Sequence, residues 1–239
     1  MVQKRESGAT AILRSLAAAE QERTRRQAQP ELGDRVQALK AYQQARLRLS
    51  HADLLASPRY AAAARFFLDE LYGPGDFSRR DAQFARIVPA LVRLFPREIV
   101  GTVATLGELH ALTESLDSAM AEALPSAALD APAYVRAWQV TGRRADRERQ
   151  IDLLLDVARS LDRYTRTPML SVSLRMMRAP ARAAGLSDLQ VFLERGFDTF
   201  KTLRGADEFL GCIEAHERAL LAQLFTADPS SLAGSGQLP

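Results

Sequence analysis

"REIVGTVATLGELHALTESLDSAMAEAL", residues 97 to 124, is the stretch of sequence that decides the fold. Its apolar residues recur at intervals of three and four, which is the spacing of a helix with buried faces. They form two stripes, Leu109-Leu112-Leu116-Met120 and Val103-Leu106-His110. Because two stripes cannot both face water, we expect a long central helix buried on more than one side.

Outward from this stretch, Pro, Gly and Ser residues divide the chain into further segments with helical spacing. No segment alternates apolar and polar residues as a strand would. The abundance of Ala and Leu, with only 7% aromatic residues, also favours packed helices. We therefore predict an all-α fold, an irregular single-domain helical bundle of roughly nine helices. The main expected segments are residues 10–27, 32–56, 58–72, 79–95, 97–124, 130–142, 151–167, 168–180, 187–203 and 209–224.

Length and composition define the domain and exclude several classes of protein. A chain of 239 residues, 47% of them hydrophobic, suits one globular domain. We expect a polar N-terminal helix or extension at 1–31, the bundle at 32–225, and a disordered tail at 226–239. The net charge of +3 is too small to indicate a nucleic-acid partner, and no apolar run reaches membrane-spanning length. With a single cysteine, Cys212, the cytoplasm is the expected compartment.

A first candidate site lies in "FFLDELYGPGDFSRRD", residues 66 to 81. The Gly-Pro-Gly sequence predicts a turn, and Ser78 with Asp81 resembles a helix cap at the start of the next helix. The polar residues could instead form an anion-binding site at that helix N-terminus. We favour an inter-helix clamp with Asp76 and Asp81 as caps. The candidate polar loop comprises Tyr72, Asp76, Arg79, Arg80 and Asp81.

A second candidate is a buried polar cluster of His110, Glu114, Asp117 and His216. The first three share a face of the central helix, and His216 follows Cys212 by one turn on the last helix. We expect neutral, hydrogen-bonded core histidines and no bound metal. If they were metal ligands, Glu114 or Asp117 would complete the shell, with Cys212 as a softer option.

Two further expectations concern packing. Ser187 and Gln190 have the spacing of a capping box. Met169, Met176 and Met177 are expected to fill gaps in the core.

Two quoted segments carry a resemblance, "LLASPRYAAAARFFLDELYGPGDFSRRDAQFARIVPALVRLFP" and "MMRAPARAAGLSDLQVFLERGFDTF". Together they resemble an uncharacterised family of bacterial all-helical proteins that carry an FFL-x-x-LYGP-x-DF-x-x-RD motif. The resemblance extends from about Ala41 to Phe225. It implies a helical fold and no particular chemistry.

Catalytic motifs are absent from the sequence: it has no phosphate-binding loop, no nucleophile elbow and no H-E-x-x-H. We therefore expect a cytoplasmic binding or interaction protein without a cofactor, with a protein partner or a second copy of the chain. The alternative is a ligand- or metal-binding helical enzyme with a pocket beside the central helix. A cavity lined by polar groups would favour the alternative, and a filled apolar interior would favour the first interpretation.

Overall fold

The computed structural model describes residues 2–71, 75, 77–232 and 238–239, and no strand occurs within these ranges. The prediction of an all-α fold is confirmed. The helices are α1 (Val2–Ala28), α2 (Pro30–Ser50), α3 (Ala52–Ala56), α4 (Ala61–Phe66), α5 (Ser78–Leu94), α6 (Arg97–Glu122), α7 (Ala131–Thr141), α8 (Arg144–Thr165), α9 (Pro168–Met176), α10 (Arg178–Ala183), α11 (Ser187–Leu203) and α12 (Asp207–Thr226), with a π-helix at Phe67–Leu71.

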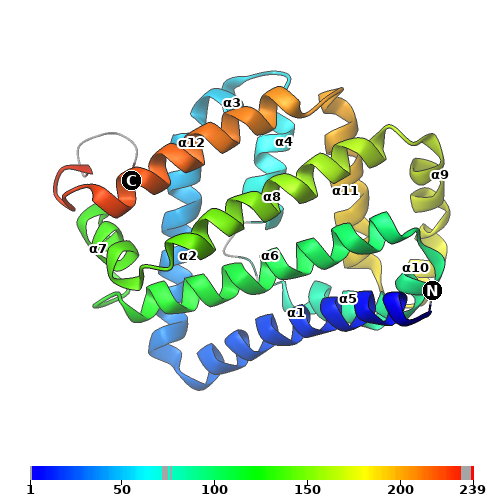
Figure 1. The fold of residues 1–239 in the computed structure, drawn as a ribbon, viewed down its shortest axis with the longest axis horizontal. Helices are drawn as coiled ribbons and strands as arrows, with labels where there is room; N and C mark the ends of the chain where they lie inside the picture. The colour runs from blue at the N-terminus through cyan, green and yellow to red at the C-terminus, as the bar shows by residue number, and fades with distance from the viewer. Residues whose placement is uncertain (1, 72–74, 76, 233–237) are drawn as a thin grey trace.

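The predicted central helix is α6, which packs against α1, α2, α5, α7 and α8. In Figure 1 the long helices α12, α8, α6 and α1 lie side by side in one layer. A second layer, containing α2, α4 and α11, crosses this one at a steep angle. The two layers meet where α2 contacts α6 and where α11 contacts α8.

Two of the expected helices are interrupted in the structure. The segment 32–56 is broken at His51 into α2 and α3, and the segment after Pro58 contains α4 followed by the π-helix. A π-helix inserts one extra residue per turn and is frequent beside functional sites. These breaks, and the division of the expected segment that begins at Pro168 into α9 and α10, make the helices more numerous than the roughly nine that periodicity predicts.

Aromatic rings from α4, the π-helix, α11 and α12 form one part of the core. The centroid of the Phe67 ring lies 5.8 Å from that of Phe200 and 5.8 Å from that of Phe209, and Tyr60 lies 5.6 Å from Phe209. Phe200 and Phe209 are 1% and 0% exposed. Burial of such rings is the main source of stability in this region.

Helix caps are only partly predictable here. Asp130 caps α7 as its position suggests, because its carboxylate accepts a hydrogen bond of 2.8 Å from the Ala133 N–H. The prediction of a capping box at Ser187 and Gln190 is wrong. The N-cap residue of α11 is Leu186, whose side chain makes no capping bond, and Gln83 of α5 accepts from the Leu189 N–H instead. A neighbouring helix thus supplies the acceptor that local spacing assigned to Ser187.

The two ends of the chain and the methionines differ in their surroundings, and residues 233–237 of the expected tail lie outside the described residues. Helix α1 packs along α6 and α5, and the tail residues Leu232 and Leu238 are buried with the main core. The expectation that the methionines fill the core is wrong, since Met169, Met176 and Met177 are 77%, 73% and 50% exposed. Among the described residues no helix has both the length and the apolar character needed to cross a membrane.

Candidate functional site

A cavity of about 130 Å³ lies beside α6, between α2, α5, α8 and α11. One wall is apolar and includes Phe84, Leu106, Phe192 and Leu193. Polar side chains from α2, α5 and α6 interrupt the otherwise apolar lining. These polar residues are Lys40, Gln43, Arg80, Asp81, His110, Thr113, Glu114 and Asp117.

The cavity brings together residues that the sequence analysis assigned to two separate sites. Arg80 and Asp81 of the candidate polar loop line it, as do His110, Glu114 and Asp117 of the candidate buried cluster. Arg79 points elsewhere: its side chain is 81% exposed and forms an ion pair of 3.0 Å with Asp188. Tyr72 and Asp76 lie outside the described residues. His216 does not line this cavity and belongs to another part of the fold.

Asp81 and His110 form a hydrogen-bonded pair in the cavity wall. Asp81 accepts a hydrogen bond of 2.6 Å from Arg23 of α1, and its carboxylate lies 2.8 Å from Nε2 of His110. Burial opposes ionisation of Asp81, but the bonds from His110 and Arg23 prevail and lower its pKa. The N-cap position of α5 is Phe77 rather than Ser78. Asp81 contacts side chains of α1 and α6. These contacts were not part of its expected role as a helix cap.

Glu114 is the centre of a buried charge network that joins α1, α2 and α6. It accepts hydrogen bonds from Arg26 and, at 2.8 Å, from Lys40. Burial would raise its pKa, but the charges of Lys40 and Arg26 lower it to about 2. Asp117, one turn further along α6, lies 3.9 Å from Lys40 and is only 2% exposed. Burial dominates there and raises the pKa of Asp117.

Arg80 differs from the other cations of the cavity because it is stacked rather than paired. Its guanidinium carbon lies 4.3 Å from the centroids of the Phe77 and Phe192 rings. It donates one hydrogen bond of 3.1 Å to the Glu70 carbonyl, and its contact with Asp81 is 3.9 Å long. Within the described part of the chain, no carboxylate lies within hydrogen-bonding distance of this guanidinium. Burial without such a partner lowers the pKa of Arg80.

A second cavity, of about 70 Å³, lies on the other side of Asp117. Its polar wall includes Arg46, His51 and Glu217, and it shares Gln43, Thr113 and Asp117 with the first cavity. Arg46 donates bonds of 2.6 and 2.8 Å to Glu217, and Nε2 of His51 lies 3.0 Å from the same carboxylate. Burial opposes the ionisation of Glu217, but Arg46 and His51 lower its pKa to about 2.

Several of these polar residues were missed by the sequence analysis although a signal was present. On α2 the buried stripe Leu32, Val36 and Leu39 continues at helical spacing through Lys40, Gln43 and Arg46. Polar residues that extend an apolar stripe are candidates for an interior site. His51 gave no such signal, because it lies between α2 and α3 rather than on a stripe.

A comparison with protein families gives one match, and it covers most of the chain. The model of the domain of unknown function DUF8198 matches residues 22–231. The chain therefore belongs to the DUF8198 family, and the matched residues include the whole lining of the second cavity and all of the first except Leu16. No curated protein and no solved structure shows a significant match to the chain.

Proposed function

We propose that this protein binds a small carboxylic acid in the cavity beside α6, with the ligand carboxylate on Arg80. The observation that carries the proposal is the stacked guanidinium of Arg80, which lines the cavity without a carboxylate partner in hydrogen-bonding distance among the described residues. Arginine binds carboxylates through two parallel N–H donors, so a ligand carboxylate completes its coordination.

The size and the walls of the cavity limit the class of ligand. An apolar protein cavity of roughly 150 Å³ accommodates benzene, and the cavity here is about 130 Å³. Phe84, Leu106 and Leu193 supply an apolar wall for the body of the ligand. Because the cavity is partly open rather than enclosed, an acid slightly larger than benzene, up to about the size of benzoate, is the ligand class that we propose.

The experiment is a calorimetric titration with benzoate and with its neutral isostere, benzamide. We expect benzoate to bind and Arg80→Gln to weaken it by roughly 10- to 100-fold, as the loss of a hydrogen bond to a charged group does. Arg79→Gln is the matched control, because Arg79 is adjacent and 81% exposed. Equal affinity for benzoate and benzamide, or equal binding by wild type and Arg80→Gln, would contradict the proposal.

Binding rather than catalysis is the proposed activity. The Asp81–His110 pair gives the cavity a histidine oriented by a carboxylate, which is the arrangement that an acid–base enzyme uses. The alternative is therefore an enzymatic function at the same cavity. Turnover of a bound acid would establish it. The cytoplasmic location is also a proposal, supported by the free thiol of Cys212.

A second candidate function, self-association, is favoured by the exposed methionines. Met169, Val172 and Met176 of α9 are 77%, 57% and 73% exposed, and Val191 of the neighbouring α11 is 50% exposed. Adjacent exposed apolar side chains favour association between copies. Light scattering should show a concentration-dependent dimer that Met176→Glu abolishes. Val140→Glu, at a 75% exposed position on α7, is the matched control; a monomer at every concentration would contradict this candidate.

A further inference from the structure

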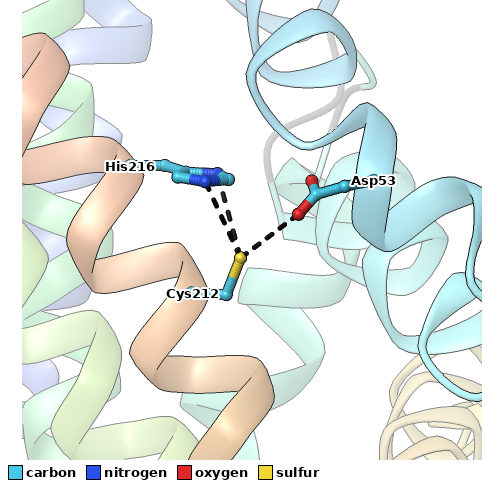
Figure 2. A group of neighbouring side chains, drawn as sticks. All are labelled: Asp53, Cys212 and His216. Carbon is cyan, nitrogen blue, oxygen red and sulfur yellow. Dashed lines mark hydrogen bonds between the residues drawn. The ribbon is translucent and has the colours of Figure 1, made fainter.

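Three side chains that can bind metal converge between α3 and α12, away from the cavity beside α6. Figure 2 shows the sulfur of Cys212 between the ring of His216 and the carboxylate of Asp53. Sγ lies 3.4 Å from Oδ2 of Asp53 and 3.8 Å from Nε2 of His216. One ligand atom from each residue lies within 4.8 Å of the other two.

These separations are close to those between ligands of one tetrahedral zinc ion. Bond lengths of about 2.0 to 2.3 Å at tetrahedral angles place neighbouring N, O and S ligands about 3.3 to 3.6 Å apart. The Cys212–Asp53 distance falls within this range, and the Cys212–His216 distance exceeds it slightly. A small movement of exposed or half-buried side chains is therefore sufficient to form the shell.

A hydrogen-bonded chain behind His216 supplies an independent observation. Nδ1 of His216 lies 3.4 Å from Nδ1 of His51, whose Nε2 lies 3.0 Å from Glu217. If His51 donates from Nε2 to the Glu217 carboxylate, its Nδ1 accepts the proton of His216 Nδ1. Nε2 of His216, which lies 3.8 Å from Sγ of Cys212, is then left without a proton and can bind a metal. Metal-binding histidines are commonly oriented in this way through their second nitrogen.

We infer that Asp53, Cys212 and His216 form a binding site for a divalent cation of the zinc class, with His51 and Glu217 as positioning residues. The donor set of thiolate, imidazole and carboxylate is one that zinc prefers. Three protein ligands leave a coordination position for water or for an external ligand. The inference replaces Glu114 and Asp117, the carboxylates considered from the sequence, by Asp53.

Metal binding at this site displaces the proton of the Cys212 thiol. Burial and the neighbouring Asp53 raise the pKa of the Cys212 thiol to about 11, so at neutral pH the sulfur carries a proton. The metal–sulfur bond forms as this proton leaves to the buffer. Binding should therefore release one proton and weaken as the pH is lowered.

Cobalt(II) is the probe, added to protein that has been treated with a chelator and freed of it. Cys212 is the single cysteine of the chain, so a thiolate-to-cobalt charge-transfer band can arise from this residue alone. We expect one cobalt per chain, a charge-transfer band with tetrahedral d–d bands, and loss of all of them when zinc is added.

Variants locate the site. Cys212→Ser should abolish the charge-transfer band, and His216→Asn should weaken cobalt binding at least tenfold. His51→Asn should weaken it by roughly 10- to 100-fold, as changes in the residues behind a ligand do. His110→Asn is the control and should leave binding unchanged, because His110 lies at the other cavity. Thermal melts of each variant without metal verify that it folds.

Three results would overturn the inference: no cobalt binding, cobalt bound without a thiolate band, or unchanged affinity in His216→Asn. The test is independent of the carboxylic-acid proposal, because Asp53, Cys212 and His216 do not line the cavity beside α6.

Discussion

Around Phe209 the interior is aromatic, whereas around Glu114 it is charged. The ring of Phe209 is fully buried against Tyr60 and Phe67, and its burial needs no particular partner beyond apolar volume. Glu114 is 4% exposed and depends on Arg26 of α1 and Lys40 of α2. A buried charge network adds little net stability compared with apolar packing, although removal of one member is costly. We therefore expect the aromatic region to be the larger source of stability, and the proposed ligand binding gives a reason for keeping the charged region.

The comparison predicts that truncation in the aromatic region has the largest effect. Phe209→Ala removes a fully buried ring and should lower the free energy of unfolding by about 3 to 5 kcal/mol. Urea denaturation at neutral pH measures this change. Benzoate affinity of the fraction that remains folded should not change. A loss below about 1 kcal/mol would show that the region is not a principal source of stability.

Acid should affect the charged region selectively. The folded-state pKa values of Glu114 and Glu217 are lowered from 4.5 to about 2. Their stabilisation is complete above the unfolded-state pKa and is lost as the pH falls from 4.5 toward 2. The two groups together should remove on the order of 4 kcal/mol of stability between about pH 6 and about pH 3.

Denaturation curves at the two pH values test this loss. Glu114→Gln provides the control and should remove about half of the acid sensitivity, since only Glu217 then titrates. The same sensitivity in wild type and Glu114→Gln would show that the lowered pKa of Glu114 does not contribute to stability.

At neutral pH, Glu114→Gln itself should have the next largest effect. The neutral amide leaves Arg26 and Lys40 buried without their carboxylate, which should cost about 3 kcal/mol in unfolding free energy. Chemical denaturation measures it. Only replacement of the whole network by apolar residues should recover that loss. An unfolding free energy of Glu114→Gln close to that of wild type would contradict the assigned pairing.

The smallest expected effect is at Asp117, on the same face of α6. Its pKa is raised by burial, so its folded state holds the proton more tightly and stability decreases as the pH rises above 3.8. Asp117→Asn keeps the shape and removes the buried charge, so at neutral pH it should stabilise the fold by at most about 1 kcal/mol. Thermal melts of Asp117→Asn and Glu114→Gln should show stability changes of opposite sign. A large destabilisation by Asp117→Asn would contradict this prediction.

The candidate site was partly predictable. His110, Glu114 and Asp117 share a face of α6 because residues three and four apart lie on one side of a helix, and all three line the cavity. Arg80 and Asp81 were assigned to an inter-helix clamp, because spacing within one helix does not show that Arg80 stacks on Phe192 of α11 or that Asp81 contacts His110 of α6. His216 was grouped with the α6 residues because, like His110, it lies on an otherwise apolar helical stripe, but its neighbours are His51 and Cys212.

Local periodicity was sufficient to determine most of the helices, though not the break at His51 or the π-helix, together with the central position of α6 and the cap at Asp130. Tertiary structure decided which charges meet. Arg26 and Glu114 are 88 residues apart, and His51 and His216 are 165 apart. Spacing along one helix carries no information about such pairs, because they depend on how helices cross. The Ser187 cap failed for the same reason: Gln83, 106 residues earlier in the chain, supplies the acceptor.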